Sequence, residues 1–106
     1  MKWVVNCRRE DFDIFIGRPS KYGNIYSHQY GTLARFKVAS REEAIYCYEQ
    51  WLYSQPELIS TLCRELEGKI LGCYCDPLAC HGDVLARIAN NVQLCLPLPD
   101  EVFKEL

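Results

Sequence analysis

The chain has 106 residues, of which 49% are hydrophobic and 25% charged, and its formal net charge is -2. This length suits one domain with a single core, and the charge balance argues against a protein that mainly coats nucleic acid. The first residues are too few and too soon charged for a signal peptide, and no apolar run is long enough to cross a membrane. We therefore expect a single domain over residues 1–106 that works in the cytoplasm, without membrane contact and with nucleic acid an unfavoured partner.

Seven cysteines are spread over the chain. The number is odd, and Cys7, Cys47, Cys63 and Cys95 fall in or near expected strands and helices rather than in a regular framework. This usage is typical of reduced thiols in a reducing compartment, so we expect no disulfide framework.

The first third of the chain predicts two strands and a polar loop. Apolar runs at residues 3–7 and 12–16 favour strands, and the second ends at Gly17. Residues 17–24 combine two cations, a proline, glycine and small polar groups, which is typical of a loop. Residues 25–38 have no clean period and fit a long loop, a lid or a short hairpin.

The remainder predicts three helices around one more strand. Ser40 as N-cap and Glu43 match a capping box that begins an amphipathic helix, whose apolar positions recur at three- and four-residue spacing over residues 44–52. Pro56 begins a second helix, which ends before Gly68, and residues 69–75 form a buried strand. A last helix covers residues 79–90, and the tail over residues 92–106 is expected to dock on the body.

Strands separated by helical connections predict a small α/β fold: a single-domain layered structure with a short, at least partly parallel sheet flanked by helices. The motif-bearing body covers about residues 3–91. The apolar side chains of Tyr48, Trp51 and Phe103 fit either the core or a contact between two copies, which leaves a homo-oligomer open.

The first candidate site lies where the strand at residues 69–75 meets the last helix. Cys73 and Cys75 point to the same face of a strand, and Cys80 and His81 stand at a helix N-terminus. Four interpretations are open: close packing of small thiols, a reactive Cys80, binding of an anion or ribose at residues 81–83, and a zinc site. The zinc ligands would be Cys73, Cys75, Cys80 and His81, although an adjacent Cys-His pair aims poorly at one ion.

The second candidate site is the loop over residues 17–24. Arg18 and Lys21, with the Ser20 hydroxyl between them, suit a phosphate group, and Tyr22 offers a ring for stacking on a base. The alternative is a solvated basic loop with a structural turn at Gly23-Asn24. Both candidate sites follow expected strands, so they fit one pocket at one edge of the sheet. Asn6 and Arg8, after the first strand, fit the same edge.

These segments together resemble a family of small domains of unknown function from bacteriophages and bacteria. The resemblance runs from about Trp3 to Asn91, and its signatures read approximately GRPSKWGNPF and LGCWC…CHGDVLA. Tyr22 and Tyr74 stand where tryptophan is usual, and Ile25 replaces a proline. The resemblance implies a functional surface made of Asn6, Arg8, Arg18, Ser20, Lys21, Gly23, Asn24, Cys75, Cys80, His81, Gly82 and Asp83.

The leading hypothesis is the binding of a small phosphorylated ligand, such as a nucleotide or an ADP-ribose-like compound. Arg18 and Lys21 would meet phosphate, and residues 81–83 would hold another phosphate or a ribose. In a phage, this activity could sequester a host signalling nucleotide in the cytoplasm of the bacterial host. The first alternative is a nucleotide- or nucleoside-processing enzyme with Cys80 or His81 as nucleophile or base and Asp83 in support. The second is a zinc-stabilised interaction module; otherwise no cofactor is expected.

Overall fold

A three-stranded parallel sheet lies at the base of the molecule. The computed structural model describes residues 2–29, 34–91 and 95. Strands β1 (Val4–Asn6) and β2 (Ile14–Phe15) both pair in parallel with the central, fully buried β5 (Leu71–Cys73), in the order β1-β5-β2. Leu71 is opposite Val4 on one side and Ile14 on the other. The predicted α/β class and the three strands are confirmed, although each strand is shorter than expected.

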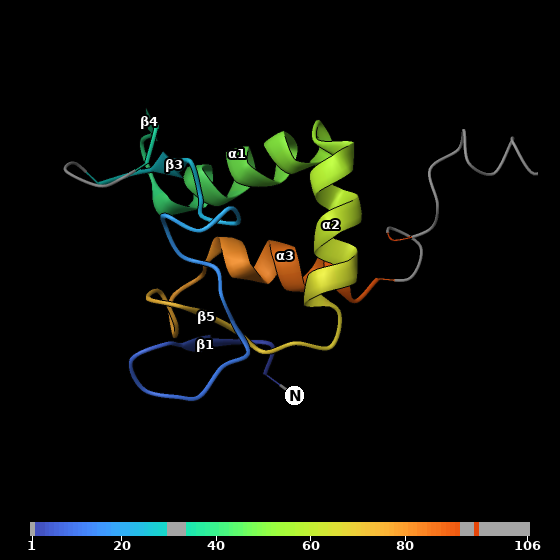
Figure 1. Ribbon diagram of the computed structural model, residues 1–106. Helices are drawn as coiled ribbons and strands as arrows, with labels where there is room; N and C mark the ends of the chain where they lie inside the picture. The colour runs from blue at the N-terminus through green and yellow to red at the C-terminus, as the bar shows by residue number, and fades with distance from the viewer. Residues whose placement is uncertain (1, 30–33, 92–94, 96–106) are drawn as a thin grey trace, which may run out of the picture.

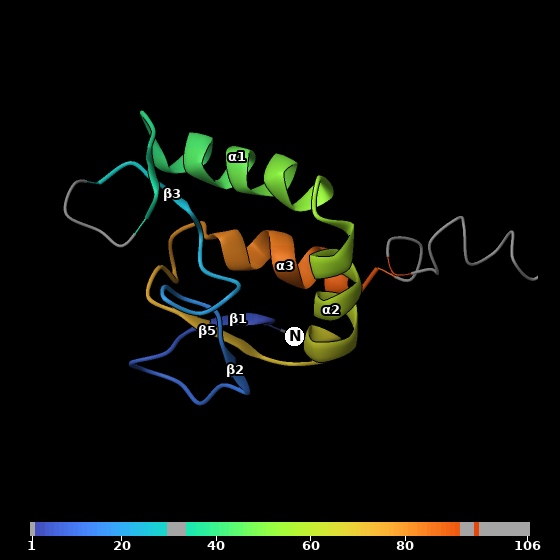
Figure 2. The ribbon, with the colours of Figure 1, turned by 45° about the horizontal axis from the view of Figure 1, so that its top comes forward.

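Three helices lie on one side of this sheet (Figures 1 and 2). They are α1 (Arg41–Tyr53), α2 (Pro56–Leu66) and α3 (His81–Ala89). The Ser40 hydroxyl caps α1 by accepting from the Glu43 amide at 3.1 Å, and Pro56 stands in the first turn of α2, where a missing N–H costs little. Both predicted helix starts are confirmed. Among the described residues, no helix is long and apolar enough to span a membrane.

Helix α3 is the centre of the core. Figure 2 shows it between α1 and the sheet, and it also contacts α2. Leu85 and Ile88 on α3 are fully buried, as are Tyr48 and Leu52, four residues apart on one face of α1. The uncertainty about Tyr48 is thereby settled in favour of the core, whereas Phe103 lies outside the described residues.

The Tyr48 hydroxyl makes a buried hydrogen bond that ties α1 to the loop over residues 17–24. It donates to the carbonyl oxygen of Tyr22 at 2.7 Å. Tyr48→Phe should lower the free energy of unfolding by about 1–3 kcal/mol, because that carbonyl loses its donor away from water. Tyr46→Phe is the matched control, since Tyr46 is 64% exposed on the same helix. Denaturant titration compares the two, and an equal effect of both changes would contradict this role of Tyr48.

Residues 25–38 contain a second, two-stranded sheet. Strands β3 (Tyr26–Ser27) and β4 (Phe36–Lys37) pair in parallel beside the start of α1. A hairpin would require antiparallel strands, so that alternative is wrong. The Tyr26 and Phe36 rings stack with centroids 5.2 Å apart, a contact that compensates for the shortness of the two strands.

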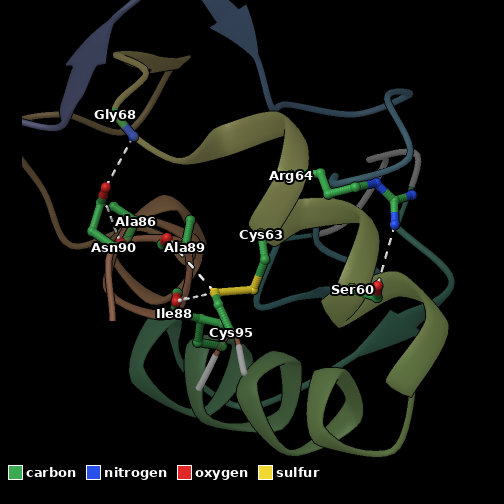
Figure 3. Close-up of a disulfide and its surroundings, with 9 residues drawn as sticks. All are labelled: Ser60, Cys63, Arg64, Gly68, Ala86, Ile88, Ala89, Asn90 and Cys95. Carbon is green, nitrogen blue, oxygen red and sulfur yellow. Dashed lines mark hydrogen bonds between the residues drawn. A yellow bond between two sulfur atoms is a disulfide. The ribbon is translucent and has the colours of Figure 1, made fainter. Parts of the chain in front are cut away.

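One disulfide contradicts the expectation that the cysteines are all reduced. Cys63 on α2 is bonded to Cys95, whose sulfur lies 3.2 Å from the carbonyl oxygen of Ile88 at the end of α3 (Figure 3). The sequence separates these cysteines by 32 positions, and only the packing of α2 against α3 brings them together. The rest of the predicted docking tail, residues 92–94 and 96–106, lies outside the described residues.

Candidate functional site

The two candidate segments meet at a cavity of about 500 Å³. Because β2 and β5 are parallel, the loop after β2 and the turn after β5 leave the sheet at the same edge. Helix α1 and the segment after Asn24 complete the wall. The lining residues are Gly17, Arg18, Asn24, Tyr26, Ser27, His28, Gln29, Arg41, Ala44, Ile45, Cys73, Tyr74, Cys75, Leu78, Ala79, Cys80 and His81.

Three thiols form a cluster in the wall of this cavity. The sulfur atoms of Cys73, Cys75 and Cys80 all lie within 4.8 Å of one another, and those of Cys73 and Cys80 are 2.9 Å apart. Cys73 and Cys80 are buried, whereas Cys75 is partly exposed. The cluster arises because the last residue of β5, Cys73, and Cys75 in the turn that follows meet Cys80, the cap of α3.

The thiols differ in acidity. Hydrogen bonds from Cys73 and Cys80 and the nearby Arg41 guanidinium lower the pKa of Cys75. The pKa of Cys80 is raised, chiefly by its hydrogen bonds with Cys73 and Cys75 and then by burial. The thiol best suited to act as an anion is therefore Cys75, rather than Cys80 as the helix N-terminus alone suggested.

His81 is held in the interior by both ring nitrogens. Its Nε2 donates to the carbonyl oxygen of Ile16 at 2.8 Å, and its Nδ1 lies 3.4 Å from the Cys80 sulfur. The edge of the imidazole meets the Tyr48 ring, with centroids 5.1 Å apart. Burial lowers the pKa of His81, so the ring is neutral. This arrangement fastens α3 to the end of β2.

The remaining residues of the α3 start have structural partners. The Asp83 carboxylate accepts from the Cys80 amide at 3.0 Å, and the Gly82 amide donates to the Cys80 sulfur at 3.3 Å. A Cβ at Gly82 would lie 2.6 Å from Cδ1 of Ile16, so this glycine allows α3 to pack closely on the sheet. We expected Gly82 to let a ligand approach the backbone closely, but the side chains of Ile16 and Val4 occupy that space.

The loop over residues 17–24 presents one cation to the cavity. Arg18 lines the cavity, and one guanidinium nitrogen donates to the Asn24 carbonyl at 3.0 Å. The Asn24 side chain is buried, donating to the Ala44 carbonyl and accepting from the Tyr26 amide. A Cβ at Gly23 would lie 2.9 Å from Cα of Arg18, which explains the glycine in this turn.

Three predicted site residues of the same loop with polar or aromatic side chains, Ser20, Lys21 and Tyr22, are not among those that line the cavity. Tyr22 is 2% exposed and donates from its hydroxyl to Glu65, so its ring offers no open face for a base. Lys21 forms an ion pair with Glu65 at 2.8 Å. The Ser20 hydroxyl is buried, with no hydrogen-bond partner in the described part of the chain. The phosphate contact predicted for Lys21 and the stacking predicted for Tyr22 therefore have no place at this cavity.

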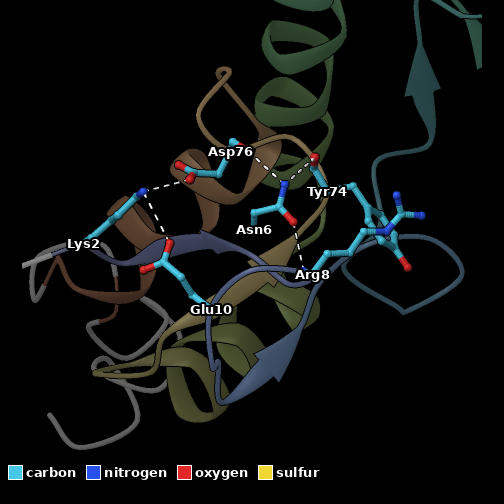
Figure 4. Close-up of polar contacts among 6 residues, drawn as sticks. All are labelled: Lys2, Asn6, Arg8, Glu10, Tyr74 and Asp76. Carbon is cyan, nitrogen blue, oxygen red and sulfur yellow. Dashed lines mark hydrogen bonds and ion pairs between the residues drawn. The ribbon is translucent and has the colours of Figure 1, made fainter.

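Asn6, Arg8 and Tyr74 lie together at the end of β1 (Figure 4). The side-chain amide of Asn6 donates to the carbonyl oxygens of Tyr74 and Asp76, and its oxygen accepts from the backbone N–H of Arg8. These bonds join β1 to the turn after β5. The Arg8 guanidinium lies 4.8 Å from the centre of the Tyr74 ring, which is 53% exposed. Asn6 is thus structural, and Tyr74 rather than Tyr22 is the accessible ring.

Sequence reasoning missed Arg41 as a site residue. It stands in the first turn of α1, next to the capping serine, and its guanidinium donates to the Ala79 carbonyl at 3.3 Å across the cavity wall. In the sequence, Arg41 directly follows the predicted capping serine, and this context indicates only the start of a helix. The proximity of Arg41 to the turn after β5 depends on how α1 packs against α3.

The fold and this cavity define a small α/β domain with a thiol cluster and two arginines at one sheet edge. Residues 4–91 match the family described as "Domain of unknown function (DUF4326)". The chain belongs to this family.

One relative is an "uncharacterized 12.4 kDa protein in nrdA-td intergenic region" of Enterobacteria phage T4. It is 34% identical over 92 residues, which make up 84% of this chain and 78% of the phage protein. No solved structure matches the chain. The resemblance to a family of unknown function with a phage member is thus confirmed, and neither description says what these proteins bind.

Proposed function

We propose that this chain binds a small phosphorylated ligand of the nucleotide or ADP-ribose class. The supporting observation is that Arg18 and Arg41, from separate segments of the chain, both line the cavity. Guanidinium groups match the geometry of phosphate oxygens and keep their charge at any physiological pH. A guanidinium carries five N–H donors, so the single backbone bond described for each arginine does not exhaust it.

The other part of such a ligand would meet aromatic and small polar groups. Tyr74 has a half-exposed ring at the cavity, already covered on one side by Arg8. Tyr26 and Ser27 line the wall near α1. A volume of about 500 Å³ falls within the range of about 300–1,000 Å³ that is common for small-molecule sites. In a phage-infected bacterium, the proposed activity would be the sequestration of a host signalling nucleotide in the cytoplasm.

Isothermal titration with ADP-ribose, ATP and inorganic phosphate tests this proposal. Arg18→Ala and Arg41→Ala should each weaken binding about 10- to 100-fold, because each removes a charge-assisted hydrogen bond. Lys21→Ala is the matched control from the same loop, since Lys21 pairs with Glu65 and is not among the cavity-lining residues.

Two results would overturn the proposal. One is the absence of binding by every phosphorylated compound at millimolar concentration. The other is an equal loss of affinity in Lys21→Ala and Arg41→Ala, which would indicate attraction by surface charge rather than a site in the cavity. Circular dichroism of each variant confirms that the fold is retained.

A further inference from the structure

We propose that Cys73, Cys75 and Cys80 together bind one thiophilic divalent cation, with zinc as the best fit. The three sulfur atoms lie within 4.8 Å of one another at the junction of β5 and α3. Cys73 is the last residue of β5, Cys75 lies in the turn after it, and Cys80 is the cap of the helix that follows. Metal binding by the three thiols does not require a phosphorylated ligand, whereas the role of an anion as a fourth ligand, argued below, rests on the proposed function.

The geometry is close to that of a thiolate metal site. Zn–S bonds are about 2.3 Å long, so two sulfurs of a tetrahedral site are separated by about 3.8 Å. The sulfurs of Cys73 and Cys80 are 2.9 Å apart and all three pairs are within 4.8 Å, which requires only small side-chain movements. Three sulfur donors favour zinc over magnesium or calcium, which prefer oxygen ligands.

The surroundings suit a negatively charged metal–thiolate group. The Gly82 amide points at the Cys80 sulfur at 3.3 Å, as a supporting hydrogen bond to a ligating sulfur would. The guanidinium of Arg41 shares the cavity wall with Cys75 and would offset the net charge of three thiolates around a divalent ion.

Three protein ligands leave one position of a tetrahedral ion for another donor. All three cysteines line the cavity, so the fourth position faces the space that a small ligand would enter. Zinc sites with three protein ligands and an open position are those in which a bound water or a ligand oxygen completes the coordination. We infer that water fills this position in the ligand-free protein and that an anion in the cavity replaces it.

The first measurement is the metal content of the full chain, prepared without a histidine tag, by inductively coupled plasma mass spectrometry. We expect about one zinc per chain. Cobalt substitution should give strong thiolate-to-metal absorption, and inorganic phosphate should shift the ligand-field bands because it replaces the water at the fourth position.

Cys75→Ser and Cys80→Ser should each lower zinc retention at least 10-fold, because losing even an outer-shell partner of a metal ligand costs about 10- to 100-fold in affinity and these residues would be direct ligands. Serine also caps helices well, so Cys80→Ser keeps the start of α3. Cys47→Ser is the matched control, because Cys47 is a partly exposed free thiol outside the cluster. Thermal unfolding of the variants shows whether a loss of metal reflects a loss of fold.

The proposal is overturned if the folded protein binds neither zinc nor cobalt, or if Cys47→Ser lowers retention as much as Cys75→Ser. It is also overturned if mass spectrometry finds Cys73 and Cys80 joined as a disulfide in protein purified without oxidant. Titrations with ADP-ribose, repeated on chelator-treated protein, test ligand binding without the metal. They therefore distinguish a failure of metal binding from a failure of the proposed function.

Discussion

His81→Ala is expected to lower the free energy of unfolding by about 2–4 kcal/mol. The substitution leaves the buried Ile16 carbonyl without its donor and opens a space beside the fully buried Tyr48. Denaturant titration followed by circular dichroism measures the loss. The effect is large because His81 connects α3, the end of β2 and α1 at one point.

The second histidine provides the control for this change. His28 lines the cavity and is only partly buried, so His28→Ala should alter the free energy of unfolding by no more than about 0.5 kcal/mol. If the two alanine variants unfold at the same denaturant concentration, His81 does not hold the fold together in the way described.

Gly82→Ala should destabilise the protein by about 1–3 kcal/mol, although alanine is the better helix former. The added methyl group would lie 2.6 Å from Cδ1 of Ile16 and 3.1 Å from Cγ1 of Val4, both in the core. Helix propensity alone predicts the opposite sign, so the direction of the change is diagnostic. Differential scanning calorimetry would record it as a lower melting temperature.

A double variant identifies the cause of that loss. Ile16→Val removes the Cδ1 atom that the new methyl group would meet. Combined with Gly82→Ala, it should cost less than the sum of the two single changes, because the clash is relieved. Strict additivity would show that Gly82 is needed for another reason than its packing on the sheet.

The positions of the helices and strands could be predicted because their signals are local. The capping serine at position 40, the proline at position 56 and the four-residue spacing of Tyr48 and Leu52 all act within one or two turns. The parallel pair of β3 and β4 escaped prediction, since two-residue strands carry no usable period.

The candidate site was predicted in part, and the errors share one cause. Tyr22 and Lys21 have the residue types of a phosphate and base site, but both turn toward Glu65 on α2. Arg41 has the sequence context of a helix start, yet it reaches the cavity. A side chain's direction depends on which element packs against its segment, and this is not encoded within a few residues.

The sequence by itself determined the α/β class, the main helices and the two segments that meet at one sheet edge. Hydrophobic periodicity, capping residues and the order of strands and helices are sufficient for these, because they depend on neighbours along the chain. Only the tertiary structure decided that Cys73, Cys75 and Cys80 form one cluster, that Arg41 shares their cavity and that Cys63 is bonded to Cys95. These arrangements depend on contacts between distant segments, which the packing of α3 on the sheet and of α1 and α2 against α3 creates.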